Sequence, residues 1–321
     1  MQPDERNLAA QGRLARAGVK TVIKLSLNDK GNNDSSGVEI LVSRCQQVLT
    51  ALLLVVASSL LTSNAGAATQ STSSHGVSAT FSYRGSNFAS RDLRLVIRVG
   101  GFIRYDQPVV AKLCGRQCWP GFSGGGQRTI HVRNLGPGNR HDVVLDLYSG
   151  GAHCCTIEEV FTYDATSKHY AMAQRDFGDP SAPLFDLGHN GRYEFESADD
   201  TFAYRFTDFA ASGLPIEIVA FVHHRFHDVT RKYPRLVVND ARRWLRAFRS
   251  EAAGHYSDSN GLIAAWAADE DLLGHHTLVN RFLEQQLAQG HLNEAMGSLA
   301  PSGRAFVVAL DRFLTQRGYL R

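Results

Sequence analysis

The fold class is decided within residues 216–248, which are IEIVAFVHHRFHDVTRKYPRLVVNDARRWLRAF. The first part, Ile216–Val222, has the pattern of a strand. After Pro234 the apolar residues recur at helical spacing. They are Val237, Ala241, Trp244, Leu245 and Phe248, and the opposite side carries Arg235, Arg242, Arg246 and Arg249. We therefore expect strands before residue 233 and helices after it, with the arginines either facing water or binding an anionic polymer.

The same two patterns extend outward on both sides of this segment. In Leu93–Val99, the apolar residues Leu93, Leu95, Ile97 and Val99 alternate with Arg94, Val96 and Arg98, as on a half-buried strand. Similar segments are Val143–Tyr148, Val160–Tyr163 and Thr201–Phe206, and further helices are expected around Gly261–Asp269, Thr277–Gln289 and Arg304–Gln316. The chain is therefore predicted to be α+β. A β-rich body of propeller-blade-like or sandwich-like antiparallel sheets covers 79–232, and an α-helical domain covers 233–321.

An export signal is predicted ahead of this body, at residues 44–67. Arg44 precedes VLTALLLVVASSLL (48–61), and an A-x-A pattern ends at Ala67, where we expect cleavage. The alternative is a membrane anchor, but a span needs about 20 apolar residues. The polar extension 1–43 is explained if the start codon is assigned too far upstream and translation begins near Val38. Residues 68–78, rich in Ser and Thr, are predicted to be a flexible linker.

Composition narrows the class of protein. The chain has 321 residues, of which 43% are hydrophobic and 20% charged, and this excludes a disordered or multi-span membrane chain. Beyond residue 67 there are 27 Lys and Arg against 26 Asp and Glu, a net charge of +1. Such a balance gives no bulk attraction to nucleic acid or to a membrane surface. We expect a secreted or envelope-associated protein with no stable membrane span after cleavage.

Export changes the interpretation of the cysteines. Cys114, Cys118, Cys154 and Cys155 follow the signal, and an even number of thiols in an oxidising compartment favours disulfides. Three pairings are open: Cys114–Cys118 with the adjacent Cys154–Cys155, or either of two crossed arrangements. A zinc site is disfavoured by the ligand spacing. A nucleophilic thiol beside His153 is the competing hypothesis for the last pair, and oxidation would make it inert.

Two turn-rich loops, at 134–144 and 186–196, align without gaps at an offset of 52 residues. With DVVLDLYSGGAHCC (142–155) and DLGHNGRYEFESADDTFAYRF (186–206), they resemble FG-GAP and VCBS repeats of integrin-α-like propellers and a group of secreted bacterial VCBS-like proteins. The resemblance implies blade-like sheets and calcium held at loop positions one, three, five and nine. Residues 79–230 supply about three blade lengths, fewer than the four or more of a typical closed propeller.

Only some calcium-ligand positions of these loops carry suitable oxygens. The second loop has Asp186, Asn190 and Glu194, and the first has only Asn134 and Asp142, with glycine at the remaining positions. Calcium takes six to eight oxygen ligands and binds more tightly as their charge increases. The resemblance therefore predicts a weak calcium site in the second loop, while the first is expected to be a metal-free turn.

No recognised catalytic motif is present, so the leading hypothesis is a non-enzymatic binding protein with an extracellular or cell-wall ligand. The alternatives are a purely structural envelope protein and a hydrolase that uses the acids beside the second loop. Those acids are Glu194, Glu196, Asp199 and Asp200. His223 and His227 would lie about 13 Å apart on an extended strand, too far to share one zinc ion.

Overall fold

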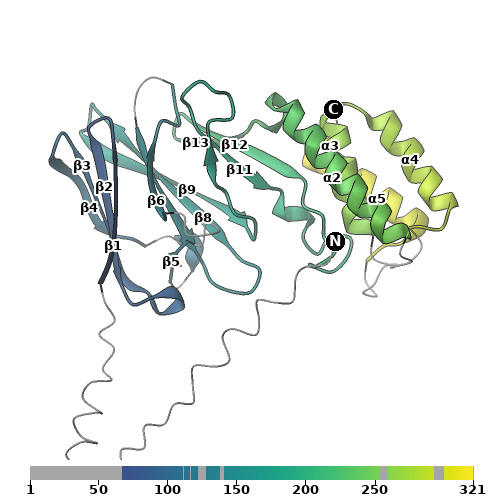
Figure 1. Cartoon of the computed structure of the whole chain (residues 1–321), viewed down its shortest axis with the longest axis horizontal. Helices are drawn as coiled ribbons and strands as arrows, with labels where there is room; N and C mark the ends of the chain where they lie inside the picture. The colour runs from purple at the N-terminus through teal and green to yellow at the C-terminus, as the bar shows by residue number, and fades with distance from the viewer. Residues whose placement is uncertain are drawn as a thin grey trace, which may run out of the picture. The chain divides into compact units, whose positions relative to one another are not determined.

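The computed structural model describes residues 67–110, 112–115, 117–121, 128–137, 141–253, 259–292 and 300–320, all within one unit, Asn64–Arg321. The predicted extension 1–43 and the predicted signal peptide, apart from its last residue Ala67, lie outside the described residues. Figure 1 shows strands over the first part of the described chain and helices over the last part.

The strands form three antiparallel sheets, each mostly a run of sequential neighbours. The first sheet contains β1 Ala67–Ser74, β2 Val77–Arg84, β3 Arg91–Val99 and β4 Phe102–Pro108. The middle sheet contains β5 Trp119–Pro120, β6 Ile130–Arg133, β7 Asp142–Tyr148, β8 Thr156–Asp164 and β9 His169–Gly178. The third sheet contains β10 Leu184–Phe185, β11 Glu194–Ala198, β12 Ile216–Val222 and β13 Arg225–Asp228.

The middle sheet is buried on both faces, which explains the apolar runs in β7 and β8. Val143 pairs with Phe161, and both pack into a core with the first sheet's Leu95. The adjacent residues point the other way, as alternation requires. Val144 and its partner Val160 pack with residues of the third sheet, among them Phe195, Val219 and Phe221. The sheets therefore stack through the two faces of the middle one, in the manner of a sandwich.

The prediction of a flexible linker at 68–78 is wrong. Residues 67–74 form β1, which pairs with β2 in continuous register from Ala67 opposite Arg84 to Ser74 opposite Val77. The Gln70 side chain also donates to the Thr129 hydroxyl at 3.1 Å and accepts from the Thr129 N–H at 2.9 Å. A Ser- and Thr-rich segment carries no apolar stripe, but its backbone can still complete the ladder of an edge strand.

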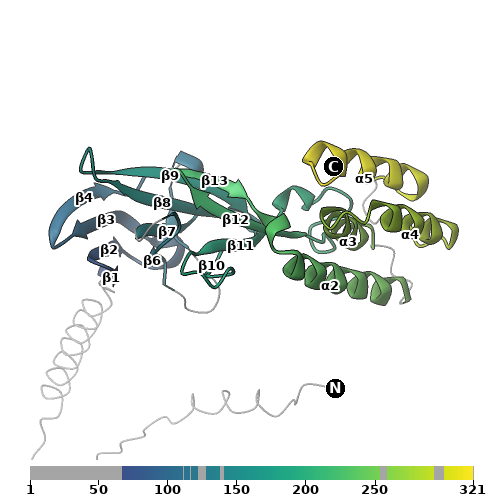
Figure 2. The ribbon, with the colours of Figure 1, turned by 90° about the horizontal axis from the view of Figure 1, so that it is seen from above.

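Four helices follow the strands in the described chain: α2 Pro234–Ala253, α3 Asn260–Leu272, α4 His276–Ala288 and α5 Gly303–Arg317. Helix α3 is buried almost all round and lies between α2, α4 and α5 in Figure 2. Its Trp266 ring lies 4.7 Å from the Phe282 ring of α4. The α+β prediction, a β-rich body followed by a helical region, is confirmed.

The segment Thr201–Phe206 is not the predicted strand. It begins with the short 3-10 helix η4 Asp200–Phe202 and continues as turns. Phe202 and Phe206 are buried in the helical core, where their ring centroids lie 4.9 Å and 5.5 Å from that of Phe313. This segment therefore anchors the β-rich part to α5. The other short 3-10 helices are η2 Asn87–Ala89, η3 Lys112–Cys114 and η5 Thr230–Lys232.

Among the described helices, none combines the length and the apolar character needed to cross a membrane.

Candidate functional site

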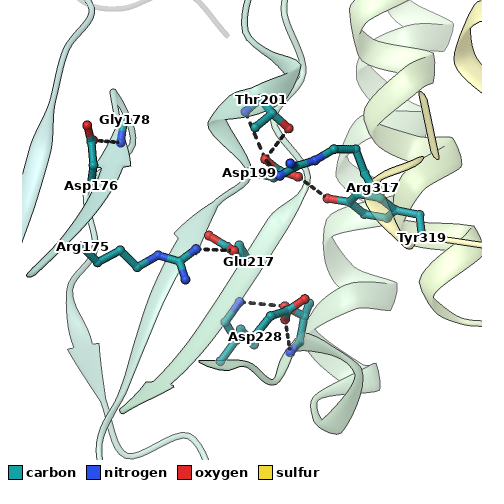
Figure 3. A network of polar contacts seen from close by, with 11 residues as sticks. Arg175, Asp176, Gly178, Asp199, Thr201, Glu217, Asp228, Arg317 and Tyr319 are labelled. Atoms are coloured by element: carbon teal, nitrogen blue, oxygen red, sulfur yellow. Dashed lines mark hydrogen bonds and ion pairs between the residues drawn. The ribbon is translucent and has the colours of Figure 1, made fainter. Parts of the chain in front are cut away.

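A polar cleft of about 290 Å³ lies where β9, η4, β12 and the end of α5 come together, beside the residue that precedes β8. We call it the polar cleft. Its lining residues are Cys155, Arg175, Asp176, Phe177, Gly178, Asp199, Asp200, Thr201, Glu217 and Arg317. Figure 3 shows most of its charged side chains and their partners.

Asp199 is the central acceptor of this cleft. It precedes η4, and its Oδ1 accepts from the Thr201 N–H at 3.0 Å and from the Thr201 hydroxyl at 2.6 Å. Its Oδ2 accepts from the buried hydroxyl of Tyr319 at 2.9 Å, and Arg317 Nη2 lies 3.5 Å from Oδ1 (Figure 3). Burial, followed by the Asp199 charge, raises the pKa of Tyr319 well above its usual value. One carboxylate therefore joins η4 to the C-terminal residues after α5.

Arg175 and Glu217 form the second charged pair. Arg175 of β9 donates to Glu217 Oε1 of β12 at 2.5 Å (Figure 3). The Arg175 guanidinium carbon also lies 4.8 Å from the centre of the Phe177 ring. Burial raises the pKa of Glu217, an effect that its attraction to Arg175 opposes. The pair links the middle and third sheets at the edge of the cleft.

The lack of a side chain at Gly178 allows its backbone to lie close to the Asp200 side chain inside the cleft. Gly178 has φ +74°, and a Cβ there would stand 2.2 Å from Asp200 Cγ. Its N–H donates to Asp176 Oδ1 at 2.8 Å, and Asp200 Oδ1 accepts from the Asp179 N–H at 3.3 Å. Burial raises the pKa of Asp200, and the nearby Asp179 and Asp176 raise it further. Only glycine fits this position without strain or displacement.

Two disulfides are present, Cys114–Cys118 and Cys154–Cys155, the first of the three predicted pairings. Both are local, so neither ties the two cysteine-containing segments together. Cys155 enters the polar cleft as a disulfide, and this excludes a free thiolate of the kind needed for nucleophilic attack in the oxidised protein. The ring of His153 packs on that of Phe209, with centroids 3.8 Å apart.

The two strings that carry the family resemblance meet at this cleft. The string 142–155 ends at Cys155, and the string 186–206 supplies Asp199, Asp200 and Thr201. His153 of the first string and Tyr204 of the second also approach each other, with ring centroids 6.4 Å apart. Their distinctive residues are therefore brought together by the fold, although they are about 50 positions apart in the sequence.

The second loop is closed by hydrogen bonds of its own. Asp186 accepts from the N–H of Asn190 at 2.9 Å and from that of Gly191 at 3.0 Å, one with each carboxylate oxygen. The Asn190 side chain accepts from the Arg192 N–H at 3.0 Å. Glu194 is buried, and burial raises its pKa despite a hydrogen bond from Tyr233. These bonds account for the loop conformation without an ion.

The first loop contacts the second. The Asn134 carbonyl accepts from the Tyr193 N–H at 2.9 Å, and Asp142 Oδ2 accepts from the Leu135 N–H at 3.4 Å. Asp142 is buried and serves to close its turn. In neither loop, nor elsewhere in the described chain, do three His, Cys, Asp or Glu side chains converge in a geometry that could hold a metal ion.

The remaining predicted acids and histidines are distributed differently. Asp199 and Asp200 lie in the polar cleft, whereas Glu196 lines a separate and more apolar cleft. The four acids of the hydrolase hypothesis therefore do not share one site. His223 and His224 form the turn between β12 and β13, and His227 lies on β13 opposite Ala220.

Four residues that organise the polar cleft gave no signal in the sequence. Arg175, Glu217 and Arg317 line the cleft, and Tyr319 donates to Asp199. Each is a single charged or aromatic residue in its own strand or terminal segment, and no local pattern distinguishes it. Among the lining residues, the sequence singled out the acids Asp199 and Asp200 and the cysteine Cys155.

Comparison with known proteins gives one distant relative. The chain is 29% identical, over 150 residues, to a probable thylakoid lumen protein of Synechocystis sp., a match that covers 45% of this chain and 44% of that protein. The match thus spans less than half of the relative's length. No family model and no solved structure matches the chain. The resemblance to FG-GAP and VCBS repeats accordingly stays a prediction.

Proposed function

We propose that this protein acts outside the cytoplasm as a non-catalytic binding protein, and that the polar cleft receives a polyhydroxylated ligand of the extracellular space or cell wall. The relative is named as a probable thylakoid lumen protein, and a lumen lies outside the cytoplasm. Two disulfides and the apolar segment 48–61 support the same compartment.

The arrangement of charges in the polar cleft carries the proposal. Its two arginines are engaged with Glu217 and Asp199, so the charges lie in a fixed framework. Asp176 and Asp200 each accept one backbone N–H and keep further acceptor capacity. A ligand with several hydroxyl groups can donate to these carboxylates and accept from the guanidinium groups.

Aromatic rings beside the cleft favour a sugar over other polar ligands. His153, Phe209 and the largely exposed Tyr204 form a group of rings on the two segments that supply Cys155 and Thr201 to the cleft. Apolar faces of sugar rings pack on aromatic side chains, while their hydroxyls need fixed hydrogen-bonding groups. Both kinds of contact are available here.

A sedimentation assay with insoluble peptidoglycan tests the proposal. We expect the wild-type protein to co-sediment and the double variant Asp176→Asn, Asp200→Asn to lose at least about tenfold in affinity. The matched control is Asp92→Asn, Asp311→Asn, which removes the same charge from positions outside the cleft lining. Equal binding by both variants would contradict a role for the polar cleft.

The hydrolase alternative is decided in the same assay. Soluble reducing sugar released by the wild-type protein, and not by Asp200→Asn, would replace the binding proposal with a catalytic one. Binding without release supports the proposal. Asp199 is unsuitable for this comparison because its loss would also remove the contacts to Thr201 and Tyr319.

Calcium binding by the second loop is a separate proposal, based on the resemblance and on Asp186, Asn190 and Glu194. Calcium would then raise the melting temperature, and a chelator would reverse the rise. Asp186→Asn should abolish this response. Identical melting of the wild-type protein with calcium and with chelator would refute the site.

A further inference from the structure

A second cleft lies on the other side of β11 from the core that contains Phe195. It measures about 620 Å³, within the size range of small-molecule sites, and is bounded by the second loop, β11 and the first turn of α2. We call it the apolar cleft. Apolar side chains provide most of its walls: Phe185, Leu187, Tyr233, Pro234 and Leu236.

One carboxylate reaches the apolar cleft without a partner. Glu196 follows Phe195 on β11 and therefore points away from the core between the sheets. Within the described chain its side chain has no hydrogen bond and no ion pair, and burial beside Asp240 raises its pKa. The other acid of the cleft, Asp186, already accepts two backbone N–H groups. Glu196 is therefore the acceptor that a ligand would meet.

Two cations border the same cleft. Lys232 and Arg235 are exposed, and neither forms an ion pair among the described residues. The apolar cleft thus combines one unpaired carboxylate with two unpaired cations around apolar walls. A purely cationic ligand would satisfy Glu196 only, and a purely anionic ligand would satisfy the two cations only. A zwitterion with an apolar body satisfies both.

We infer that the apolar cleft binds a small zwitterion of the apolar α-amino acid class. Its ammonium group would be held by Glu196, its carboxylate by Lys232 and Arg235, and its side chain by the apolar walls around Phe185 and Tyr233. Charge-assisted bonds at both ends would fix the orientation, and burial of the side chain would supply most of the affinity. The site is distinct from the polar cleft and does not depend on the function proposed for it.

Three related probes test this inference with isothermal titration calorimetry at pH 7. L-Phenylalanine carries both charges, phenethylamine lacks the carboxylate, and 3-phenylpropionate lacks the ammonium. We expect phenylalanine to bind at least about tenfold more tightly than either truncated probe. Failure of phenylalanine to bind at millimolar concentration, or equal binding of all three probes, would overturn the inference.

Variants assign each charge to its partner. Glu196→Gln should weaken phenylalanine and phenethylamine by about tenfold and leave 3-phenylpropionate unchanged. The double variant Lys232→Gln, Arg235→Gln should weaken phenylalanine and 3-phenylpropionate, but not phenethylamine. Arg246→Gln, Arg249→Gln is the matched control, because it also removes two positive charges. Both arginines are exposed on α2, the helix of Arg235, and lie outside the cleft lining. Loss of affinity in this control, or none in the two test variants, would contradict the assignment.

Discussion

Glu196 and Asp199 are only three residues apart, yet their carboxylates have opposite surroundings. Asp199, in the polar cleft, accepts from Thr201 and Tyr319 and lies near Arg317. Glu196, in the apolar cleft, has no partner among the described residues. The difference shows that a local run of acids does not determine what each acid does. Contacts from distant segments contribute as well: Tyr319 and Arg317 reach Asp199 from the C-terminal part of the chain, in addition to the local partner Thr201.

Because of this difference, the unfolding free energy should fall when Asp199 loses its charge and rise when Glu196 loses its charge. Asp199→Asn should lower the unfolding free energy by about 3 kcal/mol. The amide nitrogen is a donor, and it would face a hydroxyl or N–H group that now donates a hydrogen bond to Asp199. Urea denaturation, monitored by tryptophan fluorescence, measures this change. A loss below 1 kcal/mol would mean that Asp199 does not join η4 to the C-terminal residues.

The close packing of the polar cleft can be tested at Gly178. Gly178→Ala adds a Cβ 2.2 Å from Asp200 Cγ, whereas Gly191→Ala meets nothing within 4 Å. The two glycines have similar φ values, +74° and +78°, so the backbone strain is matched. We expect Gly178→Ala to be about 2 kcal/mol more destabilising in the same urea experiment. Equal losses would show that Asp200 moves away without cost.

Tyr319→Phe isolates a single bond of the Asp199 network. The substitution keeps the ring that packs on Phe202, at a centroid distance of 5.6 Å, and removes only the hydroxyl that Asp199 accepts. We expect a loss of about 1 to 2 kcal/mol, smaller than for Asp199→Asn, because Thr201 and Arg317 remain. The double variant should lose less than the sum of the two single losses, which a double-mutant cycle measures. Strict additivity would mean that the two residues do not interact.

The sequence predicted the elements with regular patterns. Ile216–Val222 was predicted as a strand with the bounds of β12, and the prediction Thr277–Gln289 differs from α4 by one residue at each end. Apolar periodicity carried both predictions, because it reflects burial against one face. β1 was missed since its pairing with β2, rather than its own composition, makes it a strand.

The polar cleft was less predictable for a related reason. The alternation of Phe202, Tyr204 and Phe206 with smaller or polar residues favours a strand, yet Phe202 and Phe206 are buried in the helical core. Arg175, Glu217 and Tyr319 come from separate segments, and only the tertiary fold brings them near Asp199. Local sequence thus indicated the acidic pair but not the residues that engage it.

The smallest expected effect is a gain in unfolding free energy when the charge of Glu196 is removed, opposite in sign to the loss expected for Asp199→Asn. Glu196→Gln should raise the unfolding free energy at pH 7 by at most about 1 kcal/mol, because it removes a half-buried charge that lacks a partner and that water still partly screens. The pKa of Glu196 is raised by burial, so the native state holds its proton to a higher pH than the unfolded state does. Ionisation of Glu196 therefore lowers the unfolding free energy of the wild-type protein as pH rises above about 4, and the Gln variant lacks this contribution.

The gain should consequently disappear below about pH 4, where the carboxyl is protonated in both states. Urea midpoints of the two proteins between pH 3.5 and pH 7 measure the effect. A destabilised Gln variant at pH 7 would mean that Glu196 has a favourable partner, and the contrast with Asp199 would then fail. Saturating L-phenylalanine should abolish the advantage of the variant, because the ligand's ammonium would give the wild-type carboxylate the partner it lacks.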